Sequence, residues 1–322
     1  MNDKGVLAES PLIVTHSHIT LFHTSFISST SSVQVQNTVV LIPEMSSVSF
    51  NDCAATFQET KFSGFGTLEF SSSSVTFDKK SLLETDISFV NGKILDSIIV
   101  PQRAFTADNS SFKSSSVSSN DLHITMNINL ENSTINATLL EAFCNGKCKI
   151  TTDKDSSLSN TGEGVFKGDW TVSSMTNNGA IRLEKGTIVF NNLLNNGTIT
   201  SDEYSLYTFN NITFSEHSVL SGGKAIFMKD SNIQGKMESL IIGASHVSLT
   251  VIEPLSLINA HMSCKKSRLD LQGGVSVQGS FHLDEDVDVT CNNGYMFQCN
   301  EGSSIRFNGG VGNIFGECLR ES

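Results

Sequence analysis

Short stretches of alternating apolar and polar residues recur along the chain and predict β-strands. Each stretch runs from an aliphatic or aromatic residue through a polar residue to phenylalanine, and most are followed by Asn, Asp or Ser. Apolar residues at every second position indicate a strand with one buried face, and the polar residue after it favours a bend. The stretches end at Asn51, Ser71, Asp78, Val90, Asn191, Asn210, Ser215 and Asn308.

The spacing of the phenylalanines predicts a repeat. Phe50, Phe70 and Phe89 are separated by 20 and 19 residues, and Phe190 and Phe209 by 19. Several short strands in such a period are typical of a parallel β-solenoid, in which each coil buries its inward residues against the next coil. The expected fold class is therefore all-β: a single-stranded parallel β-helix with coils of about 19–20 residues.

The 177–199 stretch contains Asn-Asn-Gly twice, and each copy is followed two residues later by isoleucine. Glycine and asparagine tolerate the positive φ of a sharp corner, and stacked asparagines can hydrogen-bond from coil to coil. If the two copies form equivalent corners, Ile181 lies above or below Ile199, and Phe190 lies above or below Phe209.

The phenylalanine signal fades between residues 110 and 165. The Ser-rich stretches 109–120 and 151–164 are predicted to be loops or excursions between coils. We expect residues 1–322 to form one continuous solenoid with a weak internal boundary near 150–165. A pair of β-sandwiches is the alternative fold.

Composition and charge limit the partners. The chain has 21 Lys and Arg against 33 Asp and Glu, a net charge of −12, and no strongly basic segment, so a nucleic-acid partner is not expected. No apolar run reaches the roughly 18 residues that a membrane span requires. The acidic start of the chain does not resemble a signal peptide.

Five Asn-x-Ser/Thr sequons suit an extracellular or cell-surface protein, because glycans occupy exposed turns. That location assumes that Met1 begins a fragment or an incomplete gene product whose signal peptide is missing. The candidate glycosylation sites are Asn109, Asn132, Asn136, Asn196 and Asn211.

The chain contains seven cysteines, so at least one thiol is free or pairs outside the chain. Cys144 and Cys148 flank Asn-Gly-Lys and are candidates for a disulfide across a turn. Three further candidates, Cys291, Cys299 and Cys318, cluster near the C-terminus. With only one close cysteine pair, a zinc site is disfavoured, and no cofactor is expected.

Two short motifs resemble a known family. Gly222–Phe227 reads GGKAIF and Asn178–Ile181 reads NGAI. These resemble repeats of right-handed parallel β-helices of the pectin-lyase-like class, especially the passenger domains of autotransporter and polymorphic-membrane-protein-like adhesins. Compared with the repeats of that family, the first motif has one extra residue, and the phenylalanines of this chain are followed directly by Asn. The resemblance implies a shape and a role at a surface.

The pectin-lyase-like resemblance also implies an enzymatic alternative, because such folds host polysaccharide lyases and hydrolases. The best acidic candidate is HLDEDVDVTC, in which His282, Asp284, Asp286 and Asp288 alternate and are expected on one face of a strand. They could act as an acid/base pair or bind calcium, although a solvated strand face is the favoured interpretation. Leu283, Val287 and Val289 are expected to point inward.

A second candidate pattern is a group of histidines near the N-terminus. His16 and His18 are expected on one strand face with His23 nearby, a spacing that suits a transition metal, although ordinary surface histidines are favoured. No nucleophile or phosphate-binding motif occurs.

The favoured function is a non-enzymatic structural or adhesive β-solenoid segment of a cell-surface or secreted protein. Its polar faces would bind a protein or carbohydrate ligand. A pectin-lyase-like enzyme that uses Asp284, Asp286 and Asp288 is the first alternative. A viral or phage fibre segment is the second.

Overall fold

The computed structural model describes residues 6–8, 11–20, 25–28, 32–78, 80–101, 103–229, 231–245, 247–272, 275–283, 287–291, 297–299, 304–307, 313–315 and 320–321. Within these ranges all regular elements are β-strands. The chain forms two compact units: unit 1 comprises Met1–Cys144 and Cys148–Gly162, and unit 2 comprises Asn145–Lys147 and Glu163–Ser322.

Unit 1 contains the first seventeen strands, the eighteenth apart from Asn145–Lys147, and the start of the nineteenth. The strands are β1 (Val6–Ala8), β2 (Leu12–Thr15), β3 (His18–Thr20), β4 (Ser25–Ser28), β5 (Ser32–Gln36), β6 (Val39–Leu41), β7 (Ser47–Asn51), β8 (Ala54–Gln58), β9 (Lys61–Ser71), β10 (Ser74–Phe77), β11 (Leu82–Val90), β12 (Lys93–Leu95), β13 (Ile98–Ile99), β14 (Ala104–Asp108), β15 (Ser110–Lys113), β16 (Ser116–Ile124), β17 (Ile128–Glu131), β18 (Thr134–Thr152) and β19 (Ser157–Val172).

Unit 2 begins within β19. Its other strands are β20 (Met175–Asn177), β21 (Ala180–Glu184), β22 (Thr187–Phe190), β23 (Leu193–Asn195), β24 (Thr198–Ser201), β25 (Leu206–Phe209), β26 (Ile212–Phe214), β27 (Val219–Ser221), β28 (Lys224–Phe227), β29 (Ser231–Glu238), β30 (Ile241–Ser245), β31 (Ser248–Lys265), β32 (Arg268–Leu271), β33 (Val275–Leu283), β34 (Asp288–Cys291), β35 (Phe297–Cys299), β36 (Ser304–Phe307), β37 (Asn313–Phe315) and β38 (Arg320–Glu321).

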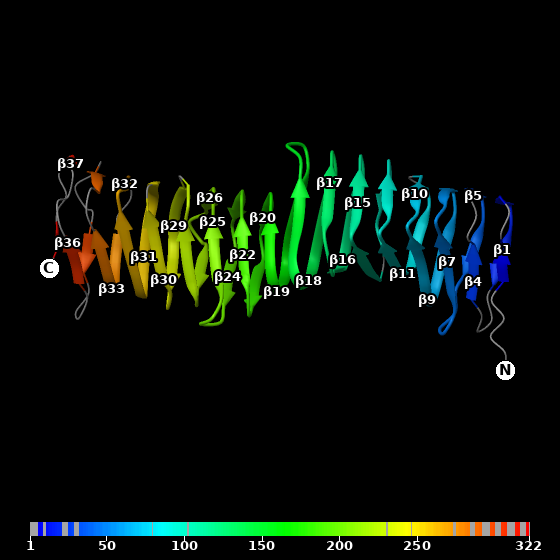
Figure 1. The fold of residues 1–322 in the computed structure, drawn as a ribbon, viewed down its shortest axis with the longest axis horizontal. Coiled ribbons are helices and arrows are strands. Elements are labelled where there is room, and N and C mark those ends of the chain that lie inside the picture. The colour runs from blue at the N-terminus through cyan, green and yellow to red at the C-terminus, as the bar shows by residue number, and fades with distance from the viewer. Residues whose placement is uncertain are drawn as a thin grey trace. The chain divides into compact units, whose positions relative to one another are not determined.

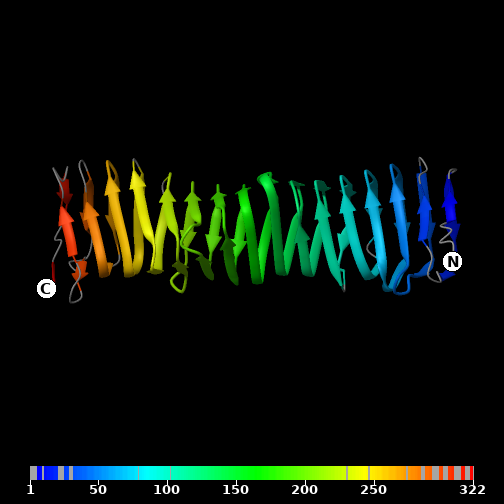
Figure 2. The ribbon, with the colours of Figure 1, turned by 60° about the horizontal axis from the view of Figure 1, so that its bottom comes forward.

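Each unit is a parallel β-solenoid, as predicted, with turns about 19 residues apart. In unit 2, β21 pairs with β24, β22 with β25 and β23 with β26, all in parallel, so a turn here contains three strands. Within each unit the coloured strands follow one another in chain order in both views (Figures 1 and 2). Parallel pairing between successive turns excludes the β-sandwich alternative for the described strands.

The predicted register of the Asn-Asn-Gly stretch is confirmed. Ile181 pairs with Ile199, and Phe190 pairs with Phe209, whose ring it stacks on at 5.9 Å between centroids. In unit 1 the 20- and 19-residue spacings likewise correspond to direct pairing of Phe50 with Phe70 and of Phe70 with Phe89. Like residues therefore lie above like residues along each solenoid.

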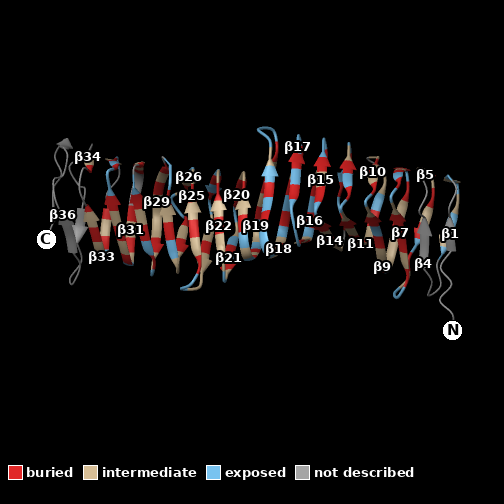
Figure 3. Ribbon diagram, viewed as in Figure 1, coloured by how far each residue is buried: buried red, intermediate tan, exposed pale blue. Residues whose placement is uncertain are grey.

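The core of each unit consists of inward side chains that alternate with outward ones (Figure 3). In unit 1, Phe70 is 1% exposed and its ring stacks on the rings of Phe50 and Phe89, 5.3 Å and 4.8 Å away. It also meets Phe57 and Phe77 edge to face, at 5.9 Å from each. Two neighbouring columns of phenylalanine thus interlock, and Phe57 and Phe77 of the second column follow Phe50 and Phe70 of the first by seven residues.

The Ser-rich stretches that were predicted to be loops are mostly strands, which corrects the prediction, although residues 153–156 form a turn between β18 and β19. Residues 109–120 contribute β15 and the start of β16, and residues 157–164 belong to β19. Serine occupies buried corners here: the Ser115 hydroxyl donates to the Lys113 carbonyl and accepts from the Ser97 backbone N–H, while Ser133 repeats the arrangement one turn later. Hydrogen-bonded corners of this kind need no phenylalanine, so the repeat continues where the phenylalanine signal fades.

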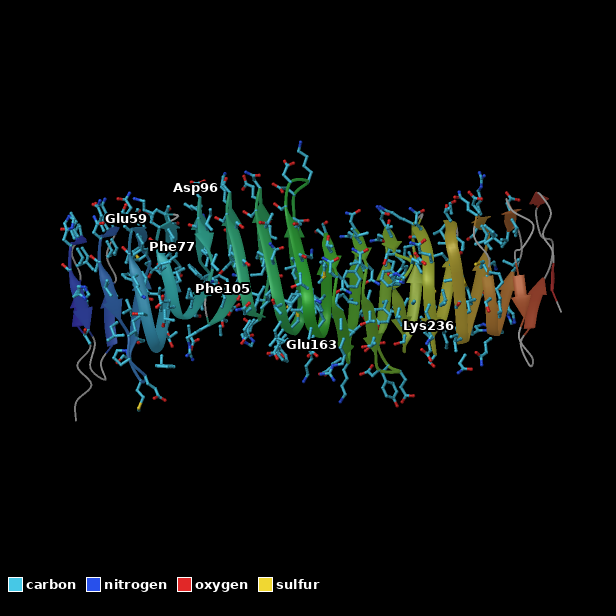
Figure 4. The ribbon with its side chains drawn as sticks, turned by 180° about the vertical axis from the view of Figure 1, so that it is seen from behind. Glu59, Phe77, Asp96, Phe105, Glu163 and Lys236 are labelled. Carbon is cyan, nitrogen blue, oxygen red and sulfur yellow. A yellow bond between two sulfur atoms is a disulfide. The ribbon has the colours of Figure 1, made fainter. Side chains whose placement is uncertain are left out.

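Corners between strands place residues in the left-handed backbone region. Glu59 and Asp96 have φ of 48° and 46°, and Figure 4 shows both at the same edge of unit 1, while Phe77 lies between the edges. The expectation of one continuous solenoid over residues 1–322 stays a prediction.

Candidate functional site

The acidic candidates of the C-terminal region are divided by the fold. Asp284 and Asp286 lie outside the described residues. His282 belongs to β33, whereas Asp288 begins β34 and pairs with Arg268 of β32 in the parallel register. The single strand expected for this segment is therefore wrong, because His282 and Asp288 belong to different strands. Leu283, Val287 and Val289 are buried, as the alternation predicted.

The N-terminal histidines do not share a strand face, which corrects that expectation. His16 has a φ of 49° and forms the corner between β2 and β3, whereas His18 begins β3. His23 lies outside the described residues. In the ranges that the structure covers, no group of three or more His, Cys, Asp or Glu side chains is arranged to hold a metal ion.

All five sequon asparagines are exposed in the structure: Asn109, Asn132, Asn136, Asn196 and Asn211. Asn109 and Asn132 occupy corners, with φ of 45° and 47°. Glycans are attached on exposed turns, so each position is sterically open to modification. Glycosylation itself stays a prediction.

Cys144 and Cys148 form a disulfide across the segment Asn145–Lys147. Cys53 is buried beside the Ser73 hydroxyl, and burial raises the pKa of its thiol. The side chains of Cys291 and Cys299, and the whole of Cys318, lie outside the described residues.

Two asparagine ladders explain the Asn-Asn-Gly repeat in unit 2. The first asparagine of each copy is fully buried, and Asn177 Nδ2 donates to Asn195 Oδ1 over 2.7 Å. The second asparagine is exposed, and Asn196 Nδ2 donates to Asn178 Oδ1 over 2.8 Å. Asn195 Nδ2 also donates to the carbonyl of Gly197, so the inner ladder closes the corner. The sequence predicted stacking, but the split between an inner and an outer ladder was not foreseen.

Replacing Asn195 by alanine should lower the free energy of unfolding of unit 2 by about 1–3 kcal/mol, because the buried amide of Asn177 loses one of its acceptors and the Gly197 carbonyl loses its side-chain donor. Urea denaturation followed by far-UV circular dichroism measures the change. Asn196→Ala is the matched control, since it removes the exposed neighbour and should change the free energy by less than about 0.5 kcal/mol. Equal losses in the two variants would contradict the role of the inner ladder.

A second recurring corner has the pattern Asp-x-x-Ser, which the sequence reading missed. Its aspartate accepts from the serine hydroxyl three residues later and from a backbone N–H one turn earlier. In unit 2, Asp202 accepts from Ser205 Oγ over 2.6 Å and from the Lys185 N–H over 3.1 Å. The same pattern occurs in unit 1 at Asp78–Ser81 and Asp153–Ser156.

These hydrogen bonds lower the pKa of each aspartate. The Ser156 hydroxyl and the Asn132 N–H lower the pKa of Asp153, and the Ser205 hydroxyl has the leading effect on the pKa of Asp202. A carboxyl whose pKa is lower in the folded state stabilises the fold above its unfolded pKa, and that stability is lost as the pH falls through the folded pKa.

Asp153→Asn should therefore reduce the melting temperature at pH 7 and have progressively less effect below about pH 4, near the unfolded pKa of aspartate. Thermal unfolding at a series of pH values measures both. Asp155→Asn is the control in the same turn, because Asp155 contributes its backbone N–H and not its carboxylate. The pH series should run from about 2.5 to about 7, so that it includes the unfolded pKa of aspartate. If Asp153→Asn lowered the melting temperature by the same amount at every pH in this series, the lowered pKa of Asp153 would not be the source of the stabilisation.

Unit 2 has a surface groove of about 730 Å³. Gly223, Ser239, Asn259 and Gly279 contribute one corner each from successive turns, all with positive φ. His261 and Ser280, Glu203, Leu240, Ile241 and Ala260 complete the lining.

The groove therefore combines a carboxylate, an amide, an imidazole and a hydroxyl with exposed corner backbone. None of Asn259, His261 and Ser280 was singled out from the sequence, because Ser280 comes from the turn after the one that carries Asn259 and His261.

Unit 1 contains a cavity of a different kind, with a volume of about 260 Å³. Its lining is wholly apolar and includes Leu12, Val35 and Phe62. It offers no group for acid/base chemistry.

Comparison with known proteins gives no match: no protein family, curated protein or solved structure is significantly similar to this chain. In the described ranges there is also no helix with the length and hydropathy to cross a bilayer.

Proposed function

We propose that the chain is a non-enzymatic structural or adhesive solenoid that binds partners through its outward strand faces. The observation that carries this proposal is the row of short polar side chains on successive turns. In unit 1, Gln34 pairs with Thr56, and Thr56 pairs with Thr76, all half-buried or exposed on the outer face. Such rows repeat at about 4.8 Å and form a regular surface that suits an extended ligand.

Exposed apolar side chains lie on a different column of strands in unit 1, formed by β6, β9 and β11. Leu41 and Leu82 are 39% and 51% exposed and lie on β6 and β11, which pair with the two sides of β9. Phe65 of β9 is 70% exposed. Protein interfaces combine apolar anchors with a polar surround, so this face supports a protein partner.

The proposed location is extracellular or at a cell surface. The Cys144–Cys148 disulfide and the exposure of all five sequon asparagines support it, because both features suit an oxidising, glycosylating compartment. A relation to pectin-lyase-like proteins and to autotransporter-type adhesins belongs to this proposal, and the parallel solenoid supports it.

The test uses the full chain secreted from eukaryotic cells behind a heterologous signal peptide. We expect a mass shift on enzymatic deglycosylation and saturable binding to a cell-surface or glycan panel, reduced by Leu82→Asp. Gln34→Asp, on the other outer row, is the matched charge control. Absence of saturable binding across the panel would refute the adhesive role.

The enzymatic alternative is tested in parallel by polysaccharide cleavage with and without calcium. A cleavage activity that Asp288→Asn abolishes would replace the adhesive proposal with a pectin-lyase-like enzyme. A trimer by native mass spectrometry would instead favour a fibre segment.

A further inference from the structure

Two histidines on adjacent turns of unit 2 face each other on the outer surface. His261 of β31 pairs with Ser280 of β33, and Ser263 pairs with His282 two residues further along. The inward neighbours Met262 and Phe281 are buried, which fixes the two imidazoles on the opposite, outward side of the strands. The ring centroids are 4.7 Å apart and the ring planes are at 88°.

This separation matches the geometry of two imidazoles on one metal ion. A metal–nitrogen bond is about 2.0–2.1 Å long, so two imidazoles that share an ion in neighbouring positions have centroids roughly 5 Å apart. The two rings come from different strands of a hydrogen-bonded ladder, so the backbone holds them at this distance without a bound ion.

Ser280 supplies the outer contact that metal-binding histidines usually have. His261 Nδ1 lies 2.5 Å from Ser280 Oγ. With the proton on Nδ1, His261 donates to Ser280 and presents the lone pair of Nε2. Histidine ligands commonly hydrogen-bond through the nitrogen that does not bind the metal, which fixes the ring and raises the basicity of the ligand.

We propose that His261 and His282 form a binding site for a first-row transition-metal cation of the Cu²⁺, Ni²⁺ or Zn²⁺ class. Imidazole nitrogen suits these ions, whereas Mg²⁺ and Ca²⁺ prefer oxygen ligands. His261 also lines the 730 Å³ groove, through which water or a partner's side chain can reach the remaining coordination positions. The net charge of −12 favours the approach of cations.

The test titrates tag-free full-length chain with NiCl₂ and ZnCl₂ by isothermal calorimetry at neutral pH. One ion per chain should bind to the wild type. His261→Ala and His282→Ala should each abolish this binding, and Ser280→Ala should weaken it about 10-fold. Excess Mg²⁺ should not compete. The double variant His16→Ala/His18→Ala is the matched control and should bind as the wild type does.

A measurement on the wild type alone guards against misfolding of the variants. Zn²⁺ should protect His261 and His282 from diethylpyrocarbonate while His16 and His18 remain reactive, as mapped by mass spectrometry. With Cu²⁺, electron paramagnetic resonance should show hyperfine coupling to two imidazole nitrogens. Absence of saturable binding, binding that survives both single substitutions, or protection at other histidines would overturn the proposal.

Discussion

Replacing Phe70 by alanine should lower the free energy of unfolding of unit 1 by about 3–5 kcal/mol. Phe70 is 1% exposed, and its ring contacts those of four other phenylalanines in two interlocking columns. The substitution removes these contacts and leaves a cavity that the fixed strand ladder cannot close by moving one turn. Denaturant unfolding gives the free energy, and hydrogen exchange should locate the loss in the turns that contain Phe50 and Phe89.

Phe65→Ala is the matched control in the same unit and on the same strand. Phe65 is 70% exposed, and its main contact is the Arg103 guanidinium, 4.9 Å from the ring centroid. An exposed cation–π contact contributes about 0.5–1 kcal/mol. If Phe65→Ala lowered the free energy of unfolding as much as Phe70→Ala does, the phenylalanine columns would not be the main source of the stability of unit 1.

Replacing Gly197 by alanine should lower the free energy of unfolding of unit 2 by about 3 kcal/mol. Here the cause is a steric clash and not a cavity. A Cβ added to Gly197 would lie 1.9 Å from the carbonyl oxygen of Gly179, one turn earlier. That oxygen accepts the backbone N–H of Thr198, so relief of the clash requires the loss of a ladder hydrogen bond. Chemical denaturation of Gly197→Ala measures the effect, with protection from exchange lost first around the Asn177 corner.

Gly243→Ala provides the control for the general effect of replacing a strand glycine. A Cβ at Gly243 has no neighbour within 4 Å. Alanine there should be neutral within about 0.5 kcal/mol, or slightly stabilising because it restricts the unfolded chain. A comparable loss in both variants would show that the close approach of the two turns at Gly197 is unimportant.

The sequence predicted those parts of the fold in which the same residue type occupies equivalent positions in successive turns. Phe50, Phe70 and Phe89 stack directly, so their spacing alone gave the turn length. Corners built from serine were not recognised, because Ser115 was assigned to a predicted loop and Ser133 was not singled out. Their hydroxyls and backbone N–H groups pair across turns, and only the folded ladder brings them together.

The candidate sites show the same limit. Alternation along a single strand placed His282 and Asp288 on one face, but they belong to different strands, β33 and β34. By contrast, His261 and His282 are 21 residues apart in the sequence and become neighbours because one turn of the solenoid separates them. Turn length therefore has to be known to within a residue before a site across turns can be predicted.

The corners also determine where the chain can change length during evolution or protein engineering. Ile181 and Ile199 are paired at a separation of 18 residues, whereas Ile199 and Leu220 are paired at 21. Two corners of the longer turn take up the extra residues while the strands on either side keep their partners: the Asp202–Ser205 corner adds one, and the Ser215–Ser218 corner adds two. Insertions and deletions at such corners should preserve the alternation of inward and outward side chains in the flanking strands. A single deleted residue within β24 would instead exchange the two faces of that strand.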